Sequence, residues 1–531
     1  MTRPFATVLE ASTSLSNNTG SWRTMRPEYV CRMPPCNATC PCGSNIQHWL
    51  SLAKVGKFRE AWEVIVNNNP FPAVMGRVCY HTCEKACNRG QFDEAVNINL
   101  IERAIGDIAL AENWQFSNTA VSSGKKVLII GSGPSGLSAA YFLKMLGHDV
   151  TVYENHAKPG GMMRYGVPRY RLPSDIIDAE IDRIKNLGVE IICNKNVDNI
   201  QDICDVFDAF YVSTGAHLPT KIDVNVKKGA NVIDAIDLFR RLEDDPDSVP
   251  NFSGNVLVYG GGNTSMDAAR VALHLGAKNV KIIYRRTIGS MPAHESELKE
   301  ALDEGVEVFC LRTINTIEKG KVLVDIMDYD EKSEVLSKTG DTETLNADHV
   351  IFAIGQSINE RIFQGINDIV VSEKGFVEID QNMMTGARGI FAGGDIISGK
   401  RSVTHAIGHA KKAAKCIDAY LRGIEYSACE RKEVANFKKI NTDYFKKNPR
   451  IKISKCYNCL THEDEIVSEA FRCFSCGNCF NCDNCYGYCP DNAIVKHPDG
   501  SMEINYNYCK GCGICASECP CGAIKMVSDE K

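Results

Sequence analysis

Residues 125–154 have the sequence KKVLIIGSGPSGLSAAYFLKMLGHDVTVYE, in which an apolar strand, a glycine-rich turn, a helix and a second strand follow in order. Gly131, Gly133 and Gly136 occupy the G-x-G-x-x-G positions, and Glu154 follows Gly131 by 23 positions. In a dinucleotide-binding fold the glycines allow the tight turn and close packing, the pyrophosphate lies at the helix N-terminus, and the carboxylate binds the ribose hydroxyls. This stretch therefore predicts a doubly wound α/β domain that binds a dinucleotide.

A second copy of this arrangement reads NVLVYGGGNTSMDAARVA, with Gly260 and Gly262 at the fingerprint positions. Its next strand, VKIIYRR, has Tyr284 where the first copy has its carboxylate, and Arg285 and Arg286 follow. Without a carboxylate for a free 2'-hydroxyl, two guanidinium groups suit a 2'-phosphate, which favours NADP and leaves NAD possible. The alternative for the arginine pair is a solvated strand end. Two nucleotide folds in one chain predict a flavoprotein that exchanges hydride with a nicotinamide.

Length and composition limit the class of protein. The chain has 531 residues, of which 44% are apolar and 24% charged, so it is long enough for two to four domains. The net charge of -6 offers no electrostatic footprint for nucleic acid or a membrane surface. The longest apolar stretches have the length of strands, and the first residues contain no long apolar run of a signal peptide. We therefore expect a cytoplasmic protein that binds neither nucleic acid nor membranes.

The 25 cysteines are concentrated near the two ends of the sequence, where dense runs with short gaps indicate metal or cluster ligands in a reducing compartment. The last 60 residues contain two copies of C-x2-C-x2-C-x3-C-P, offset by 30 positions. This is the bacterial ferredoxin run, in which three thiolates hold one 4Fe-4S cluster and the fourth reaches the other cluster. The predicted ligand sets are Cys479, Cys482, Cys485 and Cys519 for one cluster, and Cys509, Cys512, Cys515 and Cys489 for the other.

Just before these runs lie two further C-x2-C pairs, Cys456 with Cys459 and Cys473 with Cys476. Thirteen residues separate the pairs, a spacing that suits a tetrahedral four-sulfur site for zinc or a single iron. The alternative is that all four are free thiols beside the ferredoxin module.

Residues 23–425 resemble the small subunit of NADPH-dependent glutamate synthase and the matching part of dihydropyrimidine dehydrogenase. Besides the two fingerprints, the resemblance rests on PGGMMRYGVPRYRLP (159–173), FYVSTGA (210–216), AIGQ (353–356) and GIFAGGDIISGKRSVTHAIGHAKKAA (389–414). In that family the first loop holds FAD and the second fingerprint belongs to an inserted NADP domain. The resemblance implies that FAD contacts Glu154, Gly161, Gly394 and Asp395. It implies that the nicotinamide dinucleotide contacts Gly260, Gly262, Asn263, Arg285 and Arg286.

The N-terminal cysteines resemble the cluster domain of the same family. The resemblance implies one 4Fe-4S cluster on Cys40, Cys79, Cys83 and Glu102, and part of a second on Cys31, Cys36 and Cys87. The family run begins with a cysteine where this chain has Glu28. Glu28, Cys42 or no side chain completes the second cluster, so the sequence leaves one or two clusters here. The alternative for Glu102 is a solvated helix acid.

We therefore predict an α/β fold class with an N-terminal helical iron-sulfur domain, two doubly wound dinucleotide-binding domains and a C-terminal bacterial-type two-cluster ferredoxin domain of the α+β class. The NADP domain is inserted in the FAD domain. The predicted boundaries are 1–22 (arm), 23–122 (helical iron-sulfur), 123–227 (FAD, first part), 228–345 (NADP), 346–429 (FAD, second part), 430–470 (basic linker with C-x2-C) and 471–531 (ferredoxin).

The C-terminal amino-acid sequence resembles the ferredoxin-like delta subunit of 2-oxoacid:acceptor oxidoreductases, whose other chains use thiamine diphosphate. The first hypothesis is therefore the flavin subunit of a 2-oxoacid:NAD(P)+ oxidoreductase hetero-oligomer, for example one acting on 2-oxoglutarate, in which electrons pass from clusters to FAD and as hydride to NADP+. The second is an NADPH-oxidising small subunit of a glutamate-synthase type, with an FMN and iron-sulfur partner. The third is a non-enzymatic cluster scaffold that senses NADP. A hydride step needs no protein acid or base, so we assign no catalytic residue.

Overall fold

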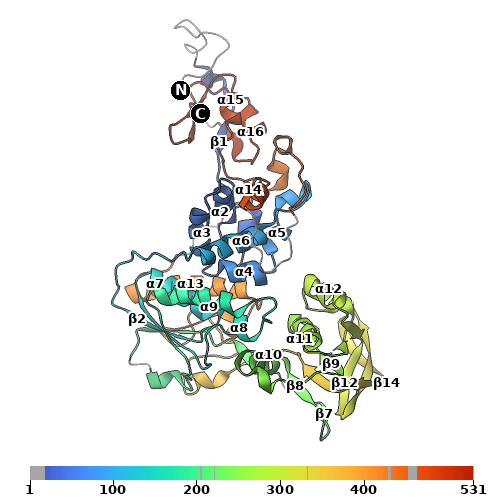
Figure 1. Cartoon of the computed structure of the whole chain (residues 1–531). Coiled ribbons are helices and arrows are strands. Elements are labelled where there is room, and N and C mark those ends of the chain that lie inside the picture. Colours follow the sequence, from blue (N-terminus) through green and yellow to red (C-terminus); the bar gives the residue numbers. More distant parts are fainter. Residues whose placement is uncertain are drawn as a thin grey trace. The chain divides into compact units, whose positions relative to one another are not determined.

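The computed structural model describes residues 18–203, 206–220, 222–331, 333–427, 432–451 and 463–529. The chain forms two compact units (Figure 1). The first contains the described parts of Met1–Pro72, His81–Ala111 and Ser427–Lys531, and the second contains those of Ala73–Tyr80 and Glu112–Tyr426. The N-terminal and C-terminal cysteine-rich segments, which the sequence separates by more than 300 residues, thus share one unit.

Short helices form the N-terminal part of the first unit. In α3 the apolar side chains Phe58, Trp62 and Ile65 recur every three or four residues and are buried, as expected for one face of a helix. Trp49 in α2 is also buried. These side chains give the segment a core of its own. The helices are α1 (Pro35–Thr39), α2 (Ile46–Ala53), α3 (Phe58–Val66), α5 (Thr82–Lys85) and α6 (Ile98–Ala111).

The C-terminal part of the first unit repeats one small motif, as the 30-residue offset of the cysteines predicts. Each copy has a one-turn helix between its cysteines and a strand after the Cys-Pro pair. An N-terminal strand, β1 (Met25–Tyr29), pairs antiparallel with the final strand β20 (Ile524–Ser528), a partner that the sequence did not predict. The other elements are α14 (Glu463–Ala470), α15 (Asn484–Gly487), β18 (Ile494–Lys496), β19 (Met502–Ile504) and α16 (Ile514–Ser517).

A five-stranded parallel sheet forms the first half of the second unit, in the order β17-β5-β2-β3-β4. The quoted stretch folds as expected, because β2, α7 (Pro134–Met145) and β3 follow one another along it. Helix α7 packs against α13 (Val403–Arg422), a long helix from the end of this unit. The strands are β2 (Lys126–Ile130), β3 (Asp149–Tyr153), β4 (Glu190–Ile192), β5 (Ala209–Val212) and β17 (Ile390–Ala392).

The second half is a similar sheet, inserted between β5 and β17, in the order β11-β10-β9-β15-β8. Both sheets are parallel and doubly wound, which confirms the predicted fold class. Helix α11 (Asn263–His274) follows β9 as α7 follows β2. The strands are β8 (Val232–Asp234), β9 (Asn255–Tyr259), β10 (Asn279–Tyr284), β11 (Glu307–Cys310) and β15 (His349–Phe352).

An antiparallel extension was not predicted. Strands β12 (Arg312–Glu318), β13 (Gly320–Asp330) and β14 (Val335–Ala347) pair antiparallel, and the short β7 (Asn225–Val226) joins them parallel to β12. The apolar face of this sheet packs on Leu257 and Ile283 of the second parallel sheet. Its strands alternate buried and exposed side chains, so one face is covered and the other is solvated. Among the described helices none combines the length and hydropathy that crossing a membrane requires.

Candidate functional site

A crevice with a volume of about 310 Å³ opens at the carboxyl ends of the strands of the second unit. Its lining includes the first glycine loop, the residues after β3 and β5, the segment around Gly394, and the start of α11 in the second sheet. Ligands of open α/β sheets bind at this edge of the strands. The first fingerprint and the residues directly after the glycines of the second, Asn263 and Thr264, therefore border the same space, although they lie more than 100 residues apart in sequence. The predicted contacts Gly260 and Gly262 lie outside this lining and stay a prediction.

In the first glycine loop, backbone segments approach each other so closely that only glycine fits. A Cβ on Gly136 would lie 1.9 Å from the carbonyl oxygen of Gly131, and Gly131 itself has φ +98°. A Cβ on Gly161 would lie 2.5 Å from the Cα of Gly133. Helix α7 begins at Pro134, with its first backbone N–H groups available to an anion. This cradle fits the pyrophosphate of FAD, as the sequence predicts.

Glu154 lies in the crevice and is only 4% exposed. Its Oε2 accepts hydrogen bonds from the backbone N–H of Ser132 at 3.0 Å and from the Ser132 hydroxyl at 2.6 Å. Its Oε1 accepts from the backbone N–H of His156 at 2.8 Å. Oε1 accepts only this one hydrogen bond and has a further lone pair, so a ribose hydroxyl can donate to it while the loop contacts remain.

Gly394 and Asp395, the other predicted FAD contacts, also line the crevice. Gly394 has φ +77°, and a Cβ there would lie 2.9 Å from Cβ of Ser135 in the first turn of α7. Burial raises the pKa of Asp395, and the charge of Arg401 opposes that shift. The two predicted FAD segments, far apart in sequence, thus approach each other across the start of one helix.

Asn263, at the start of α11, is fixed in orientation at the crevice. Its Nδ2 donates to the hydroxyl of Tyr80 at 2.6 Å, and its Oδ1 accepts from the backbone N–H of His294 at 2.7 Å. The rings of Tyr80 and His294 stack with centroids 5.0 Å apart. Burial raises the pKa of Tyr80 to about 12, so its hydroxyl stays protonated at neutral pH. Tyr80 was not predicted as a site residue, because nothing in its local sequence points to this contact.

A buried ionic triad connects the two sheets beside the crevice. Arg171 bonds both carboxylate oxygens of Asp267 on α11, at 2.8 and 2.9 Å, and lies 2.7 Å from the carboxylate of Glu297. Burial raises the pKa of Glu297 to about 7, with Arg171 opposing the shift. Arg171 and Asp267 lie in two of the motifs that carry the family resemblance, PRYRLP and GGGNTSMD. The sequence did not show that these two side chains are in contact.

Strand register explains the second fingerprint. Ile130 pairs with Tyr153 in the first sheet and Tyr259 pairs with Ile283 in the second, so Tyr284 takes the position of Glu154. The ring of Tyr284 lies against Gly261, where a Cβ would be 2.4 Å from ring carbons. Arg285 and Arg286 follow directly at the carboxyl end of β10, outside the lining of the large crevice. Their contact with a 2'-phosphate stays a prediction.

The ferredoxin cysteines gather around two cavities of the first unit. Cys479, Cys482, Cys485 and Cys519 line one, together with Cys521 and the ring of Tyr29 from β1. Cys489, Cys509, Cys512 and Cys515 line the other. Backbone N–H groups donate to two of the sulfur atoms, from Ala493 to Cys489 and from Ala523 to Cys519, each at 3.2 Å. Such donors stabilise cluster thiolates, so both sets fit the predicted 4Fe-4S clusters.

The predicted N-terminal ligands are less simply arranged. Cys40 Sγ lies 3.3 Å from Cys42 Sγ, and Glu102 accepts a hydrogen bond from Asn69 at 3.0 Å. Cys83 also belongs to the first unit but Cys79 belongs to the second, so this four-residue set stays a prediction. In the other predicted set, Cys31 is exposed, whereas Cys36 is buried.

The predicted zinc or iron site falls partly outside the described residues. Cys456 and Cys459 lie in the range 452–462, which the structure does not describe. Cys473 and Cys476 lie in the described part, next to the N-terminal helical segment, and Cys87 is near them.

Comparison with known proteins matches this geometry. Residues 125–413 match the model described as pyridine nucleotide-disulphide oxidoreductase. The chain belongs to this family. Residues 7–114 match dihydropyrimidine dehydrogenase domain II with its 4Fe-4S cluster, and residues 502–525 match a 4Fe-4S binding domain. This pyridine nucleotide-disulphide oxidoreductase is therefore an iron-sulfur flavoprotein with FAD, NADP and 4Fe-4S domains, which confirms the predicted class.

Three curated proteins illustrate the relationship. The NADP(+)-dependent formate dehydrogenase subunit beta of Moorella thermoacetica is 35% identical over 73% of this chain and 60% of its own length. The NAD-dependent dihydropyrimidine dehydrogenase subunit PreT of Escherichia coli is 31% identical over 74% of this chain and 92% of its own length. The glutamate synthase [NADPH] small chain of Azospirillum brasilense is 31% identical, over 74% and 87% respectively. The chain spans only 48% of another relative, the putative oxidoreductase YgfK of Escherichia coli.

Gly136→Ala should release FAD. The new methyl group would meet the carbonyl oxygen of Gly131 at 1.9 Å, and overpacking of this kind costs about 1–3 kcal/mol. The matched control is Gly289→Ala, where a Cβ meets nothing within 4 Å. We expect the ratio of flavin absorbance to protein to fall in the first variant and to stay unchanged in the second. Equal flavin content in both variants would contradict the close-packing role of Gly136.

Replacing Arg285 and Arg286 together by alanine should raise the KM for NADPH by about a hundredfold or more, because the variant loses two bonds between charged groups that are each worth about 1.5–3 kcal/mol. NADH lacks the 2'-phosphate, so its KM should change little. The measurement is steady-state reduction of an artificial acceptor with each nucleotide. A parallel rise of both KM values would show that the arginines do not bind the 2'-phosphate.

Proposed function

We propose that this chain is an NADP-linked electron-transfer subunit of a multi-subunit cytoplasmic oxidoreductase. The observation that carries the proposal is the shared crevice, which is bordered by the first dinucleotide fingerprint and by the start of α11 directly after the second, in a chain that also contains two ferredoxin-type cysteine cavities. Relatives named as subunits of formate and dihydropyrimidine dehydrogenases support it. The many thiols suit the reducing cytoplasm.

The side chains around the crevice bind and orient rather than transfer protons. Glu154 offers acceptors to a ribose, and the glycine contacts leave the start of α7 open to a pyrophosphate. Asn263, held by Tyr80 and His294, presents a fixed amide on the opposite sheet. Arg171 joins the loop before α9 (Ser174–Asn186) to α11 through its ion pair with Asp267, and both residues line the crevice. When bound, FAD supplies the exchange between two-electron hydride chemistry and one-electron carriers.

The proposed partner is a 2-oxoacid oxidoreductase that uses thiamine diphosphate in its own chains. Support comes from residues 479–494 and 508–526, whose text resembles the ferredoxin-like delta subunit of such complexes. In this assignment electrons enter at the ferredoxin module and leave as reduced nicotinamide. The glutamate-synthase type is the second candidate, because the match spans 87% of the Azospirillum brasilense small chain. In this second candidate the same cofactor sites carry electrons in the opposite direction, from NADPH through FAD and the clusters to the partner.

Anaerobic addition of NADPH to the purified chain should bleach the flavin absorbance and reduce benzyl viologen. Both effects follow if nicotinamide and flavin meet in one crevice and the clusters accept single electrons. The control is the same preparation with NADH, which should react more slowly. A chain that binds flavin and iron but reduces no viologen would support a scaffold that only senses NADP.

The partner is identified by isolating the chain from its native source and sequencing the subunits that copurify. A 2-oxoacid complex should contain thiamine-diphosphate chains and reduce NADP+ when a 2-oxoacid such as 2-oxoglutarate and coenzyme A are added. Copurification of a chain with FMN and a glutaminase domain would instead establish the glutamate-synthase type.

A further inference from the structure

A third cavity in the first unit is surrounded by four cysteines from both ends of the sequence. Cys36 and Cys87 come from the N-terminal helical segment, and Cys473 and Cys476 come from the loop after α14. The empty space enclosed by its lining, counted together with the opening to solvent, is about 350 Å³, compared with about 330 Å³ for each of the two ferredoxin cavities. We call these four residues the shared thiol site. Its cavity therefore has the size and sulfur content of the two ferredoxin cavities.

We propose that the shared thiol site holds a further 4Fe-4S cluster, with two ligands from each end of the chain. This ligand set differs from both sequence predictions, which placed Cys36 and Cys87 with Cys31, and Cys473 and Cys476 with Cys456 and Cys459. It supplies the thiolates that the N-terminal run lacks at Glu28. The inference does not depend on which enzyme the chain serves.

Most of the remaining lining of the cavity is apolar, and the polar side chains of Gln47, Asn88 and Arg89 complete it. Leu50, Val96, Ile98 and Phe474 contribute aliphatic or aromatic surface, and two prolines precede Cys36. Four thiolates in a largely apolar cavity would be unfavourable by themselves, whereas iron neutralises and stabilises bound thiolates.

N–H donors point at the sulfur atoms, as they do in the ferredoxin cavities. Asn88 donates from Nδ2 to Cys476 Sγ at 3.5 Å, and the backbone N–H of Ser475 donates to Cys473 Sγ at 3.4 Å. Ser475 has φ +53° and Gly477 has φ +72°, so the C-x2-C segment turns sharply. A Cβ on Gly477 would lie 2.5 Å from Cβ of Arg32. The turn is thereby packed against the N-terminal segment.

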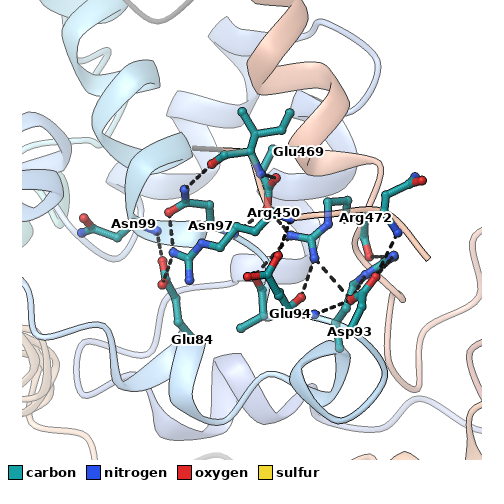
Figure 2. A network of polar contacts seen from close by, with 12 residues as sticks. Glu84, Asp93, Glu94, Asn97, Asn99, Arg450, Glu469 and Arg472 are labelled. Atoms are coloured by element: carbon teal, nitrogen blue, oxygen red, sulfur yellow. Dashed lines mark hydrogen bonds and ion pairs between the residues drawn. The ribbon is translucent and has the colours of Figure 1, made fainter. Parts of the chain in front are cut away.

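A buried polar network holds the two cysteine pairs in place (Figure 2). Arg472, directly before Cys473, donates to the carboxylate of Glu469 at 2.6 Å and to that of Asp93 at 3.3 Å. Arg89, two residues after Cys87, also bonds Asp93 and donates to the carbonyl oxygen of Arg472 at 2.6 Å. Both guanidinium groups are 2% exposed. The protein itself therefore brings both halves of the site together.

Cys31 and Glu28, which the sequence offered as ligands of the second N-terminal cluster, lie outside the shared thiol site. Cys31 is exposed, with its sulfur 3.6 Å from Oδ1 of Asn478. Glu28 pairs with Arg26 at 2.9 Å and lies 3.8 Å from Lys525. Neither residue lines the shared thiol site.

The arrangement of the sulfur atoms in the shared thiol site fits a 4Fe-4S cluster, which has a cube-shaped (cubane) core, better than it fits a single metal ion. Within the described ranges, no three His, Cys, Asp or Glu side chains are grouped closely enough for one metal ion, and this includes the ferredoxin cysteines. In a cubane each thiolate binds its own iron around a larger centre. The shared thiol site has this wider arrangement around a cavity.

The position of the shared thiol site is that of a relay. The backbone N–H of Gly477, next to Cys476, donates to the carbonyl oxygen of Cys521 at 2.6 Å. Cys521 lines the cavity of the first ferredoxin cluster. A cluster held by the shared thiol site would thus adjoin the ferredoxin pair through one hydrogen bond.

Iron, acid-labile sulfide and zinc are measured in the anaerobically purified full chain and in Cys473→Ser/Cys476→Ser. We expect the double variant to lose about four irons and about four sulfides per chain, with FAD content unchanged. The matched control is Cys31→Ser, which should retain all of its iron. The proposal is overturned if the double variant keeps its iron, if it loses only zinc, or if Cys31→Ser loses as much iron.

A single Cys36→Ser variant keeps the test decisive if the double variant does not fold. Serine retains a ligating oxygen, so the protein should assemble with one altered cluster. In dithionite-reduced protein we expect the electron paramagnetic resonance spectrum to change in one cluster component while the ferredoxin components persist. A spectrum identical to that of the unmodified chain would overturn the proposal.

Discussion

The ion pairs of the buried Arg472 side chain join the N-terminal and C-terminal segments of the first unit. This side chain reaches carboxylates on both sides, Glu469 within its own segment and Asp93 within the N-terminal segment. Burial acts against the charge of Asp93, but hydrogen bonds from Arg89 and from two backbone amides lower its pKa to about 2. The carboxylate is therefore ionised at neutral pH, and its stabilising contribution is lost only as the pH falls through its folded pKa. Removing one partner of such a buried pair costs about 3–5 kcal/mol.

The same network joins segments that lie far apart in the chain. Arg450 bonds Glu84 and Asn97, while the backbone N–H groups of Asn97 and Ile451 both donate to Glu469 (Figure 2). Strand β1 adds a second connection by pairing with β20. Because the two ends of the chain are bound together in these ways, sulfur ligands from both can surround one cavity. The N-terminal segment is thus part of the ferredoxin unit in structural terms.

The two units provide different chemical surroundings. In the second unit, glycines let backbone atoms approach closely, and one open crevice accommodates large, polar nucleotides. In the first unit, small cavities are lined by sulfur and apolar side chains. Low polarity and N–H donors tune the potential of clusters, whereas hydride exchange needs two cofactors held at the edges of sheets. The concentration of cysteines near both ends of the sequence corresponds to this division.

The sequence by itself determined both dinucleotide fingerprints and the grouping of the ferredoxin cysteines, because each depends on spacings within about 40 residues. Glu154 and Tyr284 could be compared for the same reason, since strand, turn and helix have nearly constant lengths. Tertiary structure alone decided that Tyr80 holds Asn263, that Arg171 meets Asp267, and that Cys36 and Cys87 face Cys473 and Cys476. These contacts join segments separated by about 90 to 440 residues. The local sequence pattern does not predict contacts between distant segments, because these form only when burial of charge and apolar surface brings the segments together.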